Sequence, residues 1–250
     1  MCSEREKCLL ILEQAHAQLA AQVRPPQKVW VGCGYTYRYS EKSLEQALIQ
    51  LLARTITGLR ASDLLLKSGF LQEQEILHRT LHEIEENIFF LAIGKIREQL
   101  GDIHEQFLQN FYQEPALSPL AQQKVTKLKR VSRPVIRDWI AATEAPNSGT
   151  LASTTAVRQL YEIGSGYVHA SSAQIMDSCV GDPPRWQLRG NFHKQLHADH
   201  DENLWNYFYR AILTFVFSAA AIGDRSLEDS LRYFAQDFAA SAGKNCAAPG

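Results

Sequence analysis

Apolar side chains recur every three or four residues over most of this chain, the spacing that gathers them on one face of a helix. The pattern predicts helices over residues 3–22, 71–100, 102–112, 151–170, 202–222 and 226–242, and one more that runs from Ser40 to about Leu66. Ser40 is the expected N-cap of that helix, and Gly69 is the expected residue just past its end. Another helix should open at Ser118-Pro119 and break or kink at Arg133-Pro134.

The two longest predicted helices are neighbours in the sequence, with only a short turn between them. Helices joined in this way usually pack as an antiparallel pair. We therefore expect an all-α fold, a helical bundle of about six to eight helices built on a long antiparallel helical hairpin over residues 41–100. Helices near 151–170 and 202–242 should complete the bundle.

Two segments depart from the helical pattern. Pro25-Pro26 ends the first helix, and the residues that follow, through Tyr39, are rich in glycine and aromatic side chains. Such residues favour extended or turn structure, including a short pair of strands. This loop would either cover a pocket or pack over the end of the bundle. Residues 171–190, which contain Gly181-Asp182-Pro183-Pro184, should be irregular.

No internal repeat or low-complexity linker divides the chain, which favours a single helical domain over residues 1–250. Within it we expect an N-terminal helix and aromatic, glycine-rich loop at 1–39, a helical bundle at 40–242 and a frayed tail at 243–250.

Composition is that of an ordinary globular protein, with 45% hydrophobic and 21% charged residues and a net charge of −1. Such a charge provides no global field to attract nucleic acid or a membrane. The five cysteines are scattered and contain no C-x-x-C, which fits a reducing cytosol. The charged start is unlike a signal peptide, and the longest apolar run, 211–223, is too short to span a bilayer. These features predict a cytoplasmic protein without a membrane partner.

Arg79 and Glu83 lie one helical turn apart on the helix predicted over 71–100. One interpretation places them inside the bundle, where Glu83 orients a partner side chain. The other is an exposed ion pair, worth only about 0.3–0.5 kcal/mol.

Tyr161, Ser165 and His169 also follow one another at single-turn spacing, and Gly164 and Gly166 lie in the same predicted helix. Glycine within a helix usually allows another backbone or a ligand to approach closely. His169 would then be a general base or a ligand-binding group. Alternatively it is a buried histidine, hydrogen-bonded to a carboxylate, that fixes the register of two helices.

The R-x-x-x-E of Arg79 and Glu83, followed by the Y-x-x-x-S-x-x-x-H of Tyr161, Ser165 and His169, resembles an all-helical family of bacterial proteins, a domain of unknown function. That family is distantly similar to the nucleotide-binding and RNase-type helical bundles known as HEPN domains. The resemblance spans about residues 45–220, rests on two short motifs, and implies a polar cluster of these five residues. HEPN relatives occur in toxin–antitoxin and phage-defence systems, so it also implies a defence- or toxin-associated role.

The HEPN ribonucleases use an R-x(4–6)-H motif, in which the arginine holds phosphate and the histidine serves in acid–base chemistry. This chain matches it once, at Arg97 and His104. Chance alone predicts such a match in a chain of this composition, and the pair straddles Gly101, where a helix should end. The motif therefore argues against a ribonuclease of the strict HEPN kind.

Three histidines, His193, His197 and His200, would share one face if their segment is helical, a spacing that can bind zinc or another divalent metal. His78 and His82, with Glu85, repeat the theme on the earlier helix. Two such faces could hold a metal that activates water for hydrolysis. Since the segment lies where a loop should enter a helix, its polar residues also have an ordinary role in capping and solvation.

A basic stretch from Lys124 to Arg137 contains no acidic residue before Asp138 and could contact the phosphates of a nucleic acid. Charge runs of this kind are more often one solvated face of a helix.

The sequence also allows a homodimer, although no heptad pattern runs long enough to require one. The leading hypothesis is a cytosolic binding or interaction protein with a buried polar cluster. The alternatives are a HEPN-like ribonuclease and a metal-dependent hydrolase.

Overall fold

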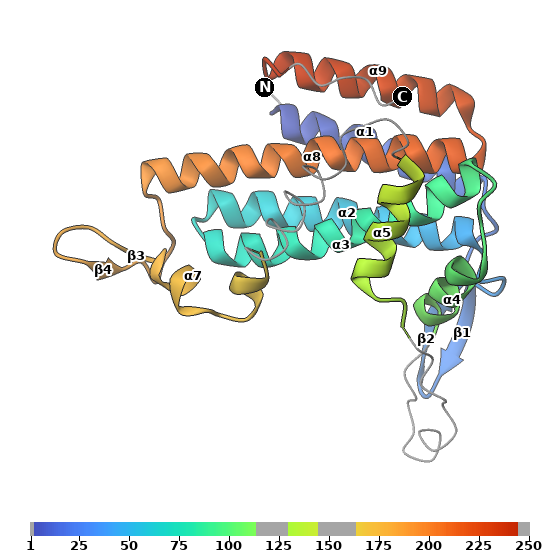
Figure 1. Ribbon diagram of the computed structural model, residues 1–250, viewed down its shortest axis with the longest axis horizontal. Coiled ribbons are helices and arrows are strands. Elements are labelled where there is room, and N and C mark those ends of the chain that lie inside the picture. The colour runs from blue at the N-terminus through green and yellow to red at the C-terminus, as the bar shows by residue number, and fades with distance from the viewer. Residues whose placement is uncertain (1–2, 114–129, 145–163, 245–250) are drawn as a thin grey trace.

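The structure, a computed structural model, describes residues 3–113, 130–144 and 164–244. Its elements are almost all helical, which confirms the all-α prediction (Figure 1). The helices are α1 (Glu4–Ala21), α2 (Leu44–Lys67), α3 (Leu71–Ile96), α4 (Asp102–Phe111), α5 (Arg133–Glu144), α7 (Ser172–Met176), α8 (Lys194–Ile222) and α9 (Arg225–Ser241). Two short antiparallel pairs of strands accompany them, β1 (Gln27–Val31) with β2 (Gly34–Arg38) and β3 (Cys179–Val180) with β4 (Arg185–Trp186).

Helices α2 and α3 pack against each other and run in opposite directions. Lys95 near the end of α3 forms an ion pair with Glu45 near the start of α2. Midway along, Leu81 lies against Gly58, where a Cβ would meet the leucine Cδ2 at 2.7 Å. Helix α8 packs on both α2 and α3, while α1 contacts α2 and α8, α9 lies on α8 and α5 lies on α3 (Figure 1).

The core is formed by aliphatic and aromatic side chains from all the long helices. Its largest fully buried members include Leu12 and Leu19 of α1, Leu48 and Leu59 of α2, Phe90 of α3, Phe208 and Phe215 of α8 and Phe238 of α9. Burying each of these side chains contributes about 1.5–3 kcal/mol. The N-terminal helix is therefore part of the same core as the rest of the bundle. Among the helices of the described ranges, none combines the length and apolar character needed to cross a membrane.

The start of α2 differs from the prediction, because Ser43 and not Ser40 caps it. Ser43 Oγ accepts a hydrogen bond from the Gln46 backbone at 3.2 Å, and the Gln46 side chain accepts one from the Ser43 backbone at 3.2 Å. This capping box satisfies two backbone N–H groups that a helix beginning at Glu41 would leave open. Lys42 has a left-handed backbone, with φ of +54°, which also excludes an earlier start.

Helix α3 ends at Ile96, before the predicted stop at Gly101. Glu98 adopts a left-handed backbone with φ of +55°, and the Gln99 N–H reaches back to the Gly94 carbonyl at 2.8 Å. This closes the helix in the way glycine usually does. The sequence contains no glycine at that point and so gives no warning of the stop.

Helix α8 begins at Lys194, eight residues before the predicted start at 202. The prediction placed the polar residues of 194–201 in a loop that leads into the helix. In the structure His200 is buried one turn before the buried Leu204, so this polar turn belongs to the packed face. The spacing of apolar residues does not indicate where a polar residue is buried, so it does not predict this first part of α8.

Helix α5 begins at Arg133, with Pro134 in its first turn, where the missing N–H costs nothing. Pro134 thus lies at a helix start and not at a break in a longer helix. The predicted opening at Ser118-Pro119, most of the predicted helix over 151–170 and the last six residues of the predicted tail lie outside the described residues.

The aromatic loop is the strand pair β1–β2, which projects away from the long helices of the bundle (Figure 1). Residues 171–190, expected to be irregular, contain the short helix α7 and the pair β3–β4.

The turn between α2 and α3 holds the segment that follows β4. Gly69 has φ of +74°, as expected for the residue just past a helix end, and the Phe70 N–H reaches the Leu65 carbonyl at 2.9 Å. The Gly69 carbonyl then accepts a hydrogen bond from the Asn191 N–H at 2.7 Å. A single glycine therefore ends α2 and anchors the approach to α8.

We expect the substitution Gly69→Ala to lower the free energy of unfolding by at least about 1–2 kcal/mol, the cost of a left-handed backbone with a Cβ. The new Cβ would also lie 2.9 Å from the Asn191 backbone nitrogen and 3.0 Å from Gly190 Cα. Urea denaturation measures the change. Gly34→Ala is the control, because its Cβ meets no atom within 4 Å. Equal stability of the two variants would contradict this account of the turn.

Candidate functional site

Helix α3 carries ionisable side chains at positions 75, 78, 82 and 85, the spacing of one helix face. Helix α8 carries a matching polar row at 200, 203, 207 and 210. The two rows face each other, and we call the resulting contact the polar seam. Its members are Glu75, His78, His82 and Glu85 of α3 with His200, Asn203, Tyr207 and Arg210 of α8. Because residue numbers rise together along both rows, α3 and α8 run parallel here.

Glu75 organises the first end of the seam. Its Oε1 accepts a hydrogen bond from Asn203 Nδ2 at 2.9 Å and lies 3.2 Å from His78 Nδ1 and 3.3 Å from His200 Nδ1. Burial alone would raise the pKa of Glu75, but the hydrogen bond and positive charge of His78, with the other neighbours, hold it below the usual value. Glu75 is therefore a carboxylate held inside the protein by donors on both helices.

The middle of the seam is a pair of flat rings. His78 stacks on Tyr207 with their centroids 4.2 Å apart and their planes 23° from parallel. His78 is fully buried and Tyr207 is partly buried, and burial raises the pKa of the Tyr207 phenol well above its usual value. Tyr207 is therefore a neutral hydroxyl over the range in which most proteins are stable.

Arg210 closes the second end. Its Nη2 lies 2.7 Å from Glu85 Oε2 and 2.7 Å from His82 Nδ1. Since arginine only donates, His82 Nδ1 is the unprotonated nitrogen, and its Nε2 faces Glu86 Oε1 at 3.0 Å. Complete burial raises the pKa of Glu85 to about 7, against the pull of Arg210. Burial also lowers the pKa of His82, so the ring is neutral near pH 7.

The next flank of α3 meets α5 through a second set of charges. Glu86 contacts Arg137 of α5 as well as His82, and Arg133 Nη1 donates to Asn87 Oδ1 at 2.7 Å. Burial would raise the pKa of Glu86, but the hydrogen bonds from His82 and Arg137 lower it to about 2. Arg133 and Arg137, two of the three arginines in the predicted basic stretch, thus face α3 instead of forming an open cationic surface, whereas Arg130 is exposed. Lys124, Lys127 and Lys129 lie outside the described residues.

The predicted pair Arg79 and Glu83 is present, with Arg79 Nη1 2.6 Å from Glu83 Oε1. The Arg79 side chain is only 10% exposed, whereas that of Glu83 is 36% exposed. The pair therefore lies between the two expected alternatives, with its arginine inside and its carboxylate at the surface.

Of the second predicted motif, Tyr161 lies outside the described residues, Ser165 is half-buried and His169 is exposed. The close approach expected at a glycine occurs at Gly164, where a Cβ would lie 3.2 Å from Arg79 Cδ. The segment that begins at 164 therefore packs on Arg79, whereas the exposed His169 is not the buried histidine of the second alternative.

The three histidines proposed as metal ligands take separate roles. His193 is exposed at the N-cap of α8, His197 Nε2 is 3.0 Å from the Leu66 carbonyl, and His200 belongs to the seam. In residues 3–113, 130–144 and 164–244, no group of three or more His, Cys, Asp or Glu side chains is placed to hold a metal ion. Within the described part of the chain, the three histidines therefore do not form the predicted metal site.

The R-x(4–6)-H match is also separated by the fold. Arg97 caps the end of α3, whereas His104 is buried in α4 with its ring stacked on Phe90 at a centroid distance of 4.1 Å. A ring packed in this way cannot reach an RNA backbone, so the geometry argues against this pair as a catalytic site.

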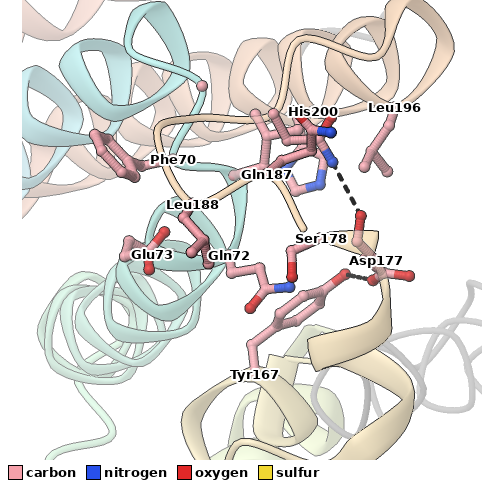
Figure 2. Close-up of a pocket in the computed structure, with 13 residues that line it drawn as sticks. Phe70, Gln72, Glu73, Tyr167, Asp177, Ser178, Gln187, Leu188, Leu196 and His200 are labelled. Carbon is pink, nitrogen blue, oxygen red and sulfur yellow. Dashed lines mark hydrogen bonds between the residues drawn. The ribbon is translucent and has the colours of Figure 1, made fainter. Parts of the chain in front are cut away.

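Two adjoining cavities open beside the seam. The larger, of about 630 Å³, is lined by charged side chains (Glu75, Arg79, Asp199, Arg210, Lys244), by polar ones (His82, His200, Asn203, Asn206) and by Gly164, Tyr167, Leu196, Trp205, Tyr207 and Tyr209. The smaller, of about 230 Å³, lies between the start of α3 and the segment around β4 (Figure 2). His200, Leu196 and Tyr167 line both.

Tyr167 and Asp177 form one wall of the smaller cavity, and Figure 2 shows the phenol pointing at the carboxylate. The Tyr167 hydroxyl donates to Asp177 Oδ2 at 2.8 Å, and Asn191 Nδ2 donates to the Asp177 carbonyl at 2.9 Å. Burial and the neighbouring carboxylate raise the pKa of Tyr167 well above its usual value. The wall is therefore fixed by hydrogen bonds between segments on both sides of α7.

The sequence did not single out Glu75, Asn203, Tyr207 or Arg210. The one available signal was the repeat of the same spacing, three, four and three residues, in the polar positions of two distant helices. That signal acquires meaning only when the two helices are known to pack in parallel.

No family model, curated protein or solved structure matches this chain. The resemblance to HEPN-like helical proteins stays a prediction, and the site is interpreted from its own geometry.

We predict that Glu86→Gln lowers the free energy of unfolding by about 3 kcal/mol near neutral pH, because it leaves Arg137 without its buried carboxylate. The folded-state pKa of Glu86, about 2, lies below its ordinary 4.5. Its stabilisation is therefore fully present above pH 4.5 and is lost as the pH falls toward 2. Denaturation curves at a series of pH values should show the two proteins converging in acid.

Glu73→Gln is the matched control, since Glu73 is an exposed carboxylate on the same helix. It should leave stability nearly unchanged at every pH. A gap between wild type and Glu86→Gln that stays constant down to pH 2 would show that the carboxylate charge is not what stabilises this contact.

Proposed function

We propose that this chain is a non-catalytic binding protein and that the larger cavity takes a small anionic molecule. The observation that carries the proposal is the composition of the cavity wall. Arg79, Arg210 and Lys244 bring three positive charges to the wall, and its carboxylates are Glu75 and Asp199. Each of the three cations is also paired with a glutamate outside the lining, namely Glu83, Glu85 and Glu202. A volume of about 630 Å³ also falls within the range of ordinary ligand pockets.

Aromatic side chains complement the cations. Trp205 and Tyr209 stack with centroids 5.5 Å apart and planes 8° from parallel, and the Lys244 ammonium lies 4.0 Å from the Trp205 ring centroid. Flat apolar walls with a few fixed charges are typical of small-molecule sites. A ligand with an anionic group and an unsaturated or ring portion fits this wall best.

The polar seam supports the same proposal by making one wall of the cavity rigid. Both ring nitrogens of His82 are engaged, one by Arg210 and one by Glu86. Removing any one partner would leave a buried charge or donor unpaired, which is strongly unfavourable. A wall that cannot rearrange loses little entropy when a ligand binds.

The test is a thermal-shift screen of the whole protein with inorganic phosphate, citrate and a nucleoside 5′-monophosphate, followed by calorimetry of whichever binds. A ligand of the folded state raises the melting temperature in proportion to the logarithm of its concentration over Kd. We expect Lys244→Met to weaken binding by about tenfold, the loss of one charge-assisted contact.

Lys95→Met is the matched control. Lys95 and Lys244 are both paired with a glutamate, and their side chains are 32% and 31% exposed. Lys95, however, lies near the C-terminal end of α3, whereas the cavity lies near the start of that helix. Equal loss of affinity in both variants would point to a general charge effect. No thermal shift with any of the three anions would contradict an anion-binding cavity.

A second candidate function, acid–base catalysis, is favoured by the tautomer of His200. Its Nδ1 lies 3.0 Å from Gln74 Oε1 and 3.3 Å from Glu75 Oε1. Both partners are acceptors, so the proton is on Nδ1 and Nε2 carries the lone pair. A histidine oriented by a carboxylate in this way, beside two cavities, has the geometry of a general base.

If His200 is a base, the protein should hydrolyse an activated ester such as p-nitrophenyl acetate, and His200→Gln should abolish that activity. Burial lowers the pKa of His200 below 6.5, so the rate should already be near its plateau at neutral pH and fall in acid. His193→Gln, an exposed histidine at the start of the same helix, is the control. A rate that does not differ between the two variants would exclude the catalytic candidate.

A further inference from the structure

The β1–β2 hairpin presents one face made of rings and a single lysine. Its register pairs Trp30 with Tyr35 and Lys28 with Tyr37 across the two strands. Cross-strand partners, and residues two apart on one strand, project from the same side of a sheet. These four residues therefore share a side, which we call the aromatic face.

The aromatic face is open to solvent. Trp30 is 70% exposed, and Tyr35 and Tyr37 are each more than half exposed. The rings meet edge to face, with centroids 5.8 Å apart in both the Trp30–Tyr35 and the Tyr35–Tyr37 pairs. Large aromatic surface left in water on a protruding two-stranded hairpin adds nothing to the core and marks an interaction site.

The two strands carry charge of one sign only. Their charged residues are Lys28 and Arg38, and no aspartate or glutamate occurs between Gln14 and Ser40. Arg24, which precedes β1, is paired with Glu41 at 2.8 Å. The Lys28 ammonium lies 3.7 Å from the centroid of the Tyr35 ring and 5.3 Å from that of Trp30. A positive charge is thus held directly beside exposed rings, in a chain whose net charge is −1.

We propose that the aromatic face binds single-stranded nucleic acid. Unpaired bases would stack on Trp30 and Tyr37, and Lys28 would contact the phosphate next to a stacked base. Exposed rings interleaved with cations are how proteins hold single strands without reading their sequence. A duplex cannot be held in this way, because its bases are already stacked on one another.

Two other occupants fit less well. A bilayer interface would be entered by the tip of the hairpin, but the tip is Gly32, Cys33 and Gly34, without a bulky apolar anchor. A second copy of the chain would bring a like-charged face against this one, and like charges opposed across an interface are unfavourable.

The inference does not depend on the proposed anion-binding cavity. The hairpin precedes α2 and lies at the end of the α2–α3 pair where Glu45 meets Lys95, whereas both cavities lie at the end marked by Gly69 and Glu75 (Figure 1). A substitution can therefore abolish binding at the aromatic face without changing binding in the larger cavity, and the reverse.

The experiment measures binding of a short fluorescein-labelled oligouridine to the full chain by fluorescence anisotropy at low salt. We expect Trp30→Ala to weaken binding by about 5- to 150-fold, the range seen when one stacking side chain is removed. Trp30→Phe should retain most of the affinity because it keeps a ring. Lys28→Gln should weaken binding and also reduce its dependence on salt.

Trp186→Ala is the matched control, since Trp186 is a 50% exposed tryptophan on the other strand pair. It should leave affinity unchanged, and the melting temperatures of all four variants should equal that of wild type. No binding by the wild type, or equal binding by Trp30→Ala, overturns the proposal. So does Trp30-dependent binding to vesicles of phosphatidylcholine and phosphatidylserine without binding to the oligonucleotide.

Discussion

Burial of charge between α3 and α8 is the constraint on which the rest of this structure depends. Glu75 and Glu85 have left water, and each requires donors from the facing helix. Those donors, His200 and Arg210, lie three turns apart on α8. The register of α8 on α3 is therefore fixed at two points, because a shift of one turn would separate both pairs.

The same constraint shapes the surroundings of the seam. Polar rows cannot be covered by the aliphatic side chains that fill the rest of the core, so the space beside them stays lined by charged and aromatic groups. Gly164 brings the last described segment before α7 close to Arg79, and Gly69 anchors the segment that follows β4. The two glycines thus position the outer walls of the cavities, while the seam supplies the inner wall.

Much of the fold was predictable because local rules decided it. The long helices follow from apolar spacing, and the end of α2 follows from Gly69. The start of α2 is also set locally, because the sequence contains the capping box of Ser43 and Gln46 as well as the competing N-cap residue Ser40. The early end of α3 at Ile96 depends on a left-handed backbone at Glu98, where no glycine indicates it. The early start of α8 at Lys194 depends on the packing of His200 against α3, which no local pattern contains.

The candidate site was harder to predict for a different reason. Arg79 and Glu83 were found because both partners lie on one helix, where spacing alone pairs them. Arg210 was missed because its partners lie on another helix. His200 was noticed for its spacing from His193 and His197, yet its real partners are Gln74 and Glu75. Spacing along one helix thus pairs Arg79 with Glu83 correctly, but it gives His200 the wrong neighbours.

The packing of α3 against α8 also means that α3 is synthesised well before the helix that covers its polar row. Contacts across the seam join residues 125 to 129 positions apart, so α2 and α3 leave the ribosome long before α8 exists. Until then, the face of α3 that will be covered presents Glu75, His78 and His82 to water instead of a continuous apolar stripe. The polar row that α8 later covers therefore leaves less apolar surface exposed on the unfinished chain, at the stage when such surface would promote aggregation.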